Sequence, residues 1–133
     1  MPGFQDLEVW KRSARLSADI YKAMATLKDF GFKDQITRSG LSIPSNIAEG
    51  SERETNKERA NFLNYAKGSA GELRTQIYIG MDIGYIDSKQ GKEWINETED
   101  PFNIFEDWFH KNKIIFMKLP EIINKIDEII SKK

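Results

Sequence analysis

The residues of this chain that could support metal chemistry lie in its carboxyl-terminal quarter. The single histidine, His110, follows Asp107 by three residues, and on a helix that spacing places both side chains on one face. Bundles that hold two iron ions use such an acid-x-x-His pair for half of the site and a second pair on another helix for the rest. The chain has no second histidine and no cysteine. The sequence therefore favours an ordinary surface histidine and predicts neither a metal nor a cofactor.

A serine among small residues is the next candidate for chemistry. Ser69 lies in the run Gly68-Ser69-Ala70-Gly71, which does not match the Gly-x-Ser-x-Gly turn of a hydrolase nucleophile. The two glycines also lack the spacing of dinucleotide-binding and phosphate-binding loops, and no predicted strand precedes them. Ser69 is therefore predicted to pack inside a helical core.

Two carboxylates, Glu49 and Glu72, flank predicted core stripes and could approach each other. General acid–base catalysis would require one of them to have a raised pKa in a pocket. The favoured interpretation is hydrogen bonding between helices, because buried polar groups need partners. The residues predicted to make such contacts between helices are Ser42, Asn46, Glu49, Ser69 and Glu72.

Basic residues in two clusters are the candidates for nucleic-acid binding. They are Lys11, Arg12 and Arg15 in the first cluster, and Arg53, Lys57 and Arg59 in the second. Acidic residues stand in or beside each cluster, so a solvated surface is the favoured interpretation. Because phosphate binding scales with the number of charges presented together, binding to RNA would need several subunits to gather these clusters into one ring.

The elements that must position these residues are all predicted to be helices, because apolar residues recur at intervals of three and four and no alternating strand pattern occurs. The spacing predicts helices at about 6–28, 33–50, 56–84 and 89–117, and a short amphipathic helix at about 120–131. Gly31 and Gly50 are predicted to end the first two helices, and Thr55-x-x-Glu58 matches a capping box for the third. The predicted fold is an all-α antiparallel four-helix bundle with an additional short C-terminal amphipathic helix, in one domain over residues 1–133.

Two packing expectations follow from this pattern. The first predicted helix carries a second apolar stripe, which we expect to contact another subunit together with the C-terminal helix. That stripe consists of Val9, Leu16, Ile20, Ala23 and Leu27. The small residues around Ser69 should let the serine-rich part of the second helix approach the third closely.

Composition excludes several classes of protein. The 133 residues, 15.4 kDa in mass, are 39% hydrophobic and 31% charged, as in a soluble globular domain. No apolar run is long enough to span a bilayer, and the N-terminus does not have the order of a signal peptide. With no cysteine and therefore no disulfides, a cytoplasmic location without membrane contact is expected.

Charge is distributed unevenly along the chain. The net charge is −1. Residues 76–110 hold 2 Lys/Arg against 8 Asp/Glu, whereas residues 1–75 hold 12 against 10 and residues 111–133 hold 6 against 3. This balance lacks the strong basic surplus of a dedicated nucleic-acid binder.

Two sequence motifs carry a resemblance to a known family. The run SIPSNIAEG occupies Ser42 to Gly50, and FLNYAKGSAGEL occupies Phe62 to Leu73. With FQDLEVWKRS from Phe4, they make about residues 4–86 similar to the four-helix bundle proteins encoded in intervening sequences of bacterial 23S ribosomal RNA genes. The resemblance implies a four-helix bundle that assembles as a homopentamer and has no enzymatic activity. It also implies kinship to the accessory variability protein of diversity-generating retroelements, which partners a reverse transcriptase and binds nucleic acid.

The sequence thus predicts a non-enzymatic, self-assembling helical bundle without a small-molecule substrate. One hypothesis gives it the role of a scaffold for RNA or a ribonucleoprotein. The alternative is an assembly module that binds a protein partner, as a reverse-transcriptase accessory protein would, and does not contact nucleic acid directly.

Overall fold

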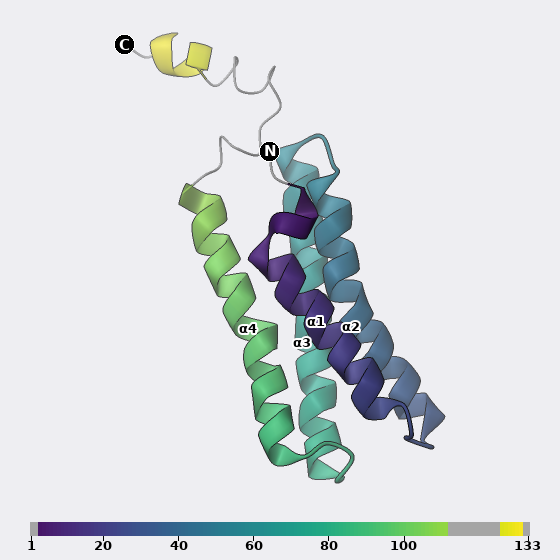
Figure 1. Ribbon diagram of the computed structural model, residues 1–133. Helices are drawn as coiled ribbons and strands as arrows, with labels where there is room; N and C mark the ends of the chain where they lie inside the picture. The colour runs from purple at the N-terminus through teal and green to yellow at the C-terminus, as the bar shows by residue number, and fades with distance from the viewer. Residues whose placement is uncertain (1–2, 112–125, 132–133) are drawn as a thin grey trace.

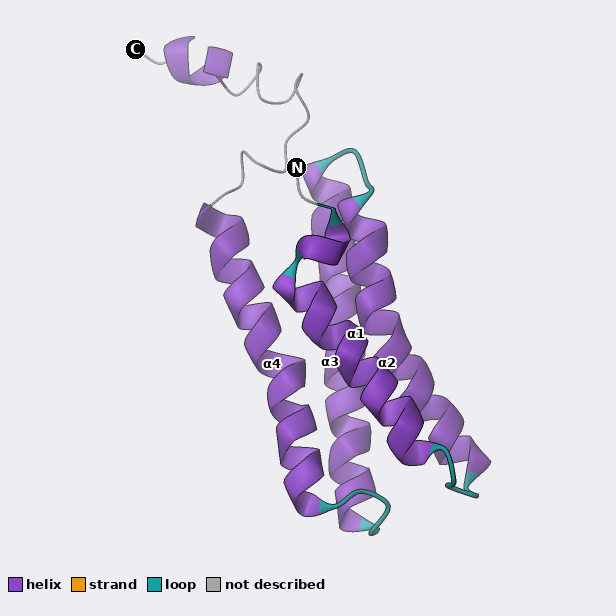
Figure 2. Ribbon diagram, in the orientation of Figure 1, coloured by secondary structure: helices purple, strands orange, loops and turns teal. Residues whose placement is uncertain are grey.

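The computed structural model describes residues 3–111, without the side chains of residues 107–111, and residues 126–131. A short 3-10 helix, η1 (Phe4–Asp6), leads into four long helices, α1 (Glu8–Met24), α2 (Phe30–Ser51), α3 (Asn56–Asp82) and α4 (Ser88–Lys111). A short helix follows at 126–131. Consecutive long helices run antiparallel, and helix is the only regular structure in the described residues (Figures 1 and 2). The predicted fold class is confirmed.

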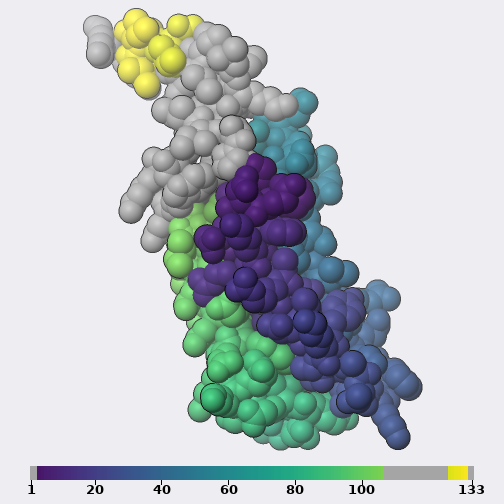
Figure 3. Space-filling model, in the orientation of Figure 1, coloured from purple at the N-terminus to yellow at the C-terminus, as the bar shows by residue number. Residues whose placement is uncertain are grey.

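The four helices pack as a closed ring of neighbours. α2 lies along α3 in the most extensive contact, α4 packs on α3, and α1 lies between α2 and α4 (Figure 3). One end of the bundle carries the start of α1, the α2–α3 turn and the end of α4 (Figure 1). This end is called the N-terminal end below, and the α1–α2 and α3–α4 loops lie at the opposite end.

The core receives side chains from every long helix. Ile20, Ile36 and Leu73 are fully buried at its centre, and Trp94 contributes from α4. Burial of such aliphatic side chains is the main force that holds the helices together.

The second stripe of α1 lies in this core. Val9, Leu16 and Ile20 are buried, whereas Ala23 is exposed. The prediction that this stripe forms an exposed subunit contact is therefore wrong. Its apolar arc is wide because α1 packs against α2 on one side and α4 on the other.

The end of the first helix differs from that predicted at Gly31, whereas α2 ends at Ser51, one residue after the predicted end at Gly50. α1 ends at Met24, and the carboxylate of Asp29 caps α2 by accepting a hydrogen bond from the backbone N–H of Phe32 at 3.1 Å. Gly31 therefore lies in the first turn of α2. Gly50 also lies inside α2, where a Cβ atom would stand 2.8 Å from the Cβ of Phe62 on α3. Close packing, and not helix termination, requires glycine at position 50.

The closest approach between small residues also differs from the expectation. Gly40 of α2 faces α1, where an added Cβ would lie 3.8 Å from the Cα of Ser17. Gly68 and Gly71 of α3 have no atom within 4 Å of such a position. Small residues therefore bring α1 close to α2, while these two glycines of α3 face open space.

The C-terminal amphipathic helix is described only over 126–131. Ile126, Ile129 and Ile130 are exposed there, with 49–63% of their surface accessible. The earlier part of this predicted helix, and residues 112–117 at the predicted end of the fourth helix, lie outside the described residues.

Thr55 supplies a testable contribution to the stability of α3. Its hydroxyl accepts a hydrogen bond from the backbone N–H of Glu58 at 3.1 Å, as the capping box predicts. Replacing Thr55 by alanine should lower the free energy of unfolding by about 1 kcal/mol, because one N–H at the helix start loses its acceptor. Urea denaturation checks this value. Thr75→Ala is the matched control, since that exposed hydroxyl only bonds back to the carbonyl of Gly71 within α3 and its loss should change stability little.

The opposite end of the bundle is joined by a hydrogen bond between its two loops. The hydroxyl of Tyr85 donates to the carboxylate of Asp29 at 2.9 Å. The backbone N–H of Phe32 and this hydroxyl together lower the pKa of Asp29. Because the folded pKa lies below the unfolded one, the contribution to stability is present at neutral pH and is lost as the pH falls through the folded value.

Tyr85→Phe should therefore raise the pKa of Asp29 towards its ordinary value, without reaching it, because the bond from Phe32 remains. An NMR titration of the Asp29 carboxyl carbon measures the change. An unchanged pKa in the variant would show that the two loops are not joined in solution.

Candidate functional site

The described part of the chain contains no cluster of side chains that could hold a metal ion. Within residues 3–106 and 126–131, no three His, Cys, Asp or Glu side chains come together as ligands for a metal ion. The side chains of Asp107 and His110 lie outside the described residues. No described helix is long and apolar enough to cross a membrane.

The first basic cluster is divided by an ion pair inside the bundle. The guanidinium of Arg12 on α1 donates from Nε and Nη2 to the two carboxylate oxygens of Glu97 on α4, at 3.0 and 2.6 Å. The hydrogen bond from Glu97 raises the pKa of Arg12. This half-buried ion pair connects α1 with α4. Lys11 and Arg15 remain exposed, and Lys11 lies 3.7 Å from Glu8.

The second basic cluster is also only partly available to a ligand. Arg53 pairs with Glu49 one turn earlier on α2 and lies over the ring of Phe62, with 4.7 Å between the guanidinium carbon and the ring centroid. Arg59 is buried, with 7% of its surface exposed. Lys57 is exposed at the start of α3. The six predicted nucleic-acid contacts therefore do not form one continuous surface of free cations.

The signature residues of α2 make their hydrogen bonds inside that helix. The hydroxyl of Ser42 donates to the carbonyl of Ser39 at 2.8 Å, and the amide of Asn46 donates to the carbonyl of Ser42 at 2.8 Å. Glu49 pairs with Arg53, which lies in the turn after α2. The prediction of polar contacts from these three residues across to α3 is therefore wrong, because short polar side chains reach the carbonyls one turn back more readily than a neighbouring helix. On α3, Ser69 is half-buried and Glu72 is exposed.

A row of exposed residues runs along the outside of α3, beside α2. We call it the α3 outer row, and it comprises Tyr65, Gly68, Glu72, Ile79 and Ile83. Tyr65, Glu72 and Ile79 follow at intervals of seven, which keeps them on one side of the helix. Tyr65, Ile79 and Ile83 are 57%, 49% and 51% exposed. The ring of Phe62 links this row to α2, because it contacts Tyr65 edge to face at 5.4 Å and lies beneath Arg53.

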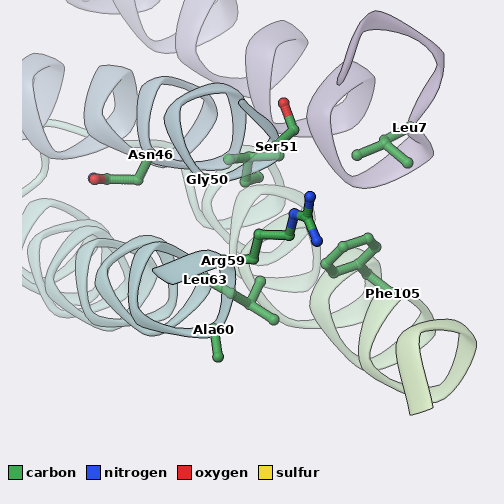
Figure 4. A pocket seen from close by; sticks show the side chains of 9 residues that line it. Leu7, Asn46, Gly50, Ser51, Arg59, Ala60, Leu63 and Phe105 are labelled. Atoms are coloured by element: carbon green, nitrogen blue, oxygen red, sulfur yellow. The ribbon is translucent and has the colours of Figure 1, made fainter. Parts of the chain in front are cut away.

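A small pocket opens at the N-terminal end of the bundle (Figure 4). Its lining includes Leu7 before α1, Gly50 at the end of α2, Leu63 of α3 and Phe105 of α4, and the guanidinium of Arg59 points into it. The charged neighbours of Arg59 in the sequence predicted a position on the surface, and this prediction is wrong because Arg59 is buried. Arg59 stands seven residues before Ala66, which is fully buried. Residues seven apart lie on the same side of a helix, so this spacing could have predicted that Arg59 is buried.

The fold and these sites define a helical bundle with an apolar core, a small and mainly apolar pocket, and a row of exposed residues along α3. The model of the family described as 23S rRNA-intervening sequence protein matches residues 5–105. The chain belongs to this family.

A solved structure supports the same conclusion. It is a protein of unknown function from the S23 ribosomal protein family of Bacteroides thetaiotaomicron, determined by crystallography. The two chains are 27% identical and align with a TM-score of 0.67, over 72% of this chain and 93% of the other. No curated protein matches the sequence.

Proposed function

We propose that this chain is a non-enzymatic scaffold that self-associates through the α3 outer row. The observation that carries the proposal is the exposure of Tyr65, Ile79 and Ile83 along one side of a helix. Exposed apolar residues that share one side of a helix can pack against a helix of another chain. The bundle has no need of them, because its core is filled by other residues of α3, including Leu73 and Ile77.

The glycine in this row favours the same interpretation. Gly68 lies inside α3 with open space around it, and glycine costs a helix about 1 kcal/mol relative to alanine. Packing within the chain gives no reason for that cost. A helix of another subunit could approach closely at this position, because no side chain stands in its way.

The charges favour protein contacts over phosphate contacts at this row. Glu72 lies near its middle and Arg53, at its edge, pairs with Glu49. A polyanion would meet a carboxylate here instead of a free cation. We also propose that the protein has no enzymatic activity and acts through contacts between its subunits.

Cross-linking tests the proposed surface directly, because the chain has no cysteine of its own. Glu72→Cys places one thiol in the α3 outer row, and a short bis-maleimide should then link two chains. Ser45→Cys, at an exposed position of α2, is the control. Equal linking at both positions, or none at position 72, would contradict the proposal.

RNA binding is a second candidate function, and the position of two exposed cations favours it, although Lys11 lies 3.7 Å from Glu8. Lys11 and Lys57 lie in the first turns of α1 and α3, and both helices begin at the N-terminal end of the bundle (Figure 1). Assembly would multiply these charges, and affinity for structured RNA would then fall steeply as salt rises.

Lys11→Glu combined with Lys57→Glu should abolish retention of structured RNA in a filter-binding titration, if RNA is a ligand. Substituting Lys28 and Lys33 at the opposite end by glutamate provides a control of equal charge change. Wild-type protein that shows no salt-dependent retention at micromolar concentration would remove RNA from the candidate functions.

A further inference from the structure

A groove follows the line where α1 packs on α4, and we call it the α1–α4 groove. Its part nearest the N-terminal end is mainly apolar and holds about 220 Å³ of space. Most of this part is formed by Leu7, Val9, Pro101, Ile104 and Phe105. An apolar cavity of about 150 Å³ can hold a benzene ring, so this part has room for a large aliphatic side chain. Ile104 is 58% exposed there.

The groove continues along the same two helices as an acidic part. Glu8 and Arg12 line both parts, so the surface is continuous. The acidic part is lined by the carboxylates of Glu8, Asp19, Glu93, Glu97 and Asp100 and by the cations of Arg12 and Arg15. Because Arg12 and Glu97 pair with each other, four carboxylates remain against Arg15 alone among the lining residues. This part therefore attracts a basic segment.

The short helix at 126–131 has the complementary character. Three of its residues are 49–63% exposed, namely Ile126, Ile129 and Ile130. A rotation of about 100° per residue puts these isoleucines on one side of the helix and its two acidic residues on the other. Lys132 and Lys133 follow in the sequence. An apolar side followed by two basic residues matches a groove that is apolar first and acidic further along.

Neither of these two surfaces is covered within one chain. The isoleucines of the helix at 126–131 and Ile104 of the groove are exposed in the same structure, and covering apolar surface is favourable. The 14 residues 112–125 lead from the end of α4 to this helix, and a chain of that length can extend over at most about 50 Å. The end of α4 itself lines the apolar part of the groove. The helix can therefore reach the groove of a neighbouring copy.

We propose that the helix at 126–131 of one chain docks in the α1–α4 groove of a second copy. Its isoleucines fill the apolar part beside Ile104, and Lys132 and Lys133 lie against the acidic part. This contact rests on the self-association proposed above and adds a second interface to it, because the α3 outer row lies on a different helix. It gives the C-terminal helix, which the sequence predicts to contact another subunit, a surface to bind.

Cysteine cross-linking between two full-length variants tests the docking, because the chain has no cysteine of its own. Glu8→Cys places a thiol where the two parts of the groove meet. Ser131→Cys places one at the end of the helix, where the hydroxyl only bonds back to the carbonyl of Glu128. One variant carries ¹⁵N, so that mass spectrometry identifies both chains of a product. A short bis-maleimide should join position 8 of one chain to position 131 of the other.

Ser45→Cys takes the place of Glu8→Cys in the control mixture, since Ser45 is an exposed residue of α2 outside the groove. The yield of linked chains should be at least about tenfold lower in this mixture, because docking raises the effective concentration of the two thiols only at the groove. Equal yields in the two mixtures, or no product between positions 8 and 131, would overturn the proposal.

A chain with both cysteines separates docking on a second copy from docking within one chain. Labelled and unlabelled Glu8→Cys/Ser131→Cys protein are unfolded together, refolded and linked. Linked peptides should combine a labelled half with an unlabelled half. Links found only between halves of the same label would overturn the proposal, because the helix would then cover the groove of its own chain.

Ile129→Asp in the Ser131→Cys chain should lower the yield by at least about tenfold, because a carboxylate would enter the apolar part of the groove. Asp127→Asn, on the other side of the helix, is the matched control and should leave the yield unchanged. Equal yields from these two variants would contradict the docking of the isoleucines.

The Glu72→Cys link of the α3 outer row, measured in parallel, separates the two interfaces. A link at position 72 without one between positions 8 and 131 would overturn the docking alone. The reverse result would support the docking and contradict only the α3 outer row. The absence of both links would contradict both interfaces.

Discussion

Replacing Ile79 by aspartate should weaken self-association by at least about 100-fold, because an apolar contact is lost and a second carboxylate joins that of Glu72 between the subunits. Ile79 is 49% exposed and stands in the α3 outer row, one heptad after Glu72. The bundle itself should keep its stability, since Ile79 lies outside the core. Sedimentation equilibrium measures the association constant, and thermal unfolding followed by circular dichroism checks the fold.

Leu41→Asp is the matched control for this variant. Leu41 is an aliphatic residue of α2 with 48% of its surface exposed. It stands two residues before the buried Ile43, which turns it away from the core by about 200° of helix rotation. Association should remain near the wild-type value in this control. A loss of the same size in both variants would mean that general surface charge, and not the α3 outer row, governs association.

Truncating Leu73 to alanine should lower the free energy of unfolding by roughly 2–5 kcal/mol, because it leaves a cavity where the helices meet. Leu73 is fully buried, and its Cδ2 would lie 3.9 Å from a Cβ placed on Gly40 of α2. A loss of this size is a large fraction of the stability of a domain this small. Urea denaturation of the full chain measures the change.

Leu41→Ala is the corresponding control for truncation, since nearly half of that side chain is already in contact with solvent. Its effect should stay within about 0.5 kcal/mol, as for most surface substitutions. Equal losses at Leu73 and Leu41 would contradict the position of the core between α2 and α3.

The spacing of apolar residues was enough to predict four helices and their antiparallel order. The apolar residues recur with the period of a helix because one side of each helix is buried. The capping box at Thr55 correctly predicted the start of α3. The end of α1 and the role of Gly50 near the end of α2 were harder to predict, because a glycine near a helix end can be either a cap or a site of close packing. At Gly50 the deciding atoms belong to Phe62, which lies on another helix.

The candidate sites were harder to predict than the fold, because they depend on contacts between residues that are distant in sequence. Arg12 and Glu97 are 85 residues apart in sequence, so their pairing was not visible as a local pattern. Ser42 and Asn46 had two sets of acceptors within reach, on their own helix and on the next. Arg59 was grouped with surface cations because its neighbours are charged, although its heptad position pointed to the core.

The mass of the full chain in solution tests the central claim most directly. Light scattering over a wide range of protein concentration should give a mass that is a multiple of 15.4 kDa, and Ile79→Asp should bring it down to that of one chain. The mass should persist in high salt, because apolar contacts survive conditions that screen surface charges. A wild-type mass of one chain across the whole concentration range would contradict self-association through the α3 outer row.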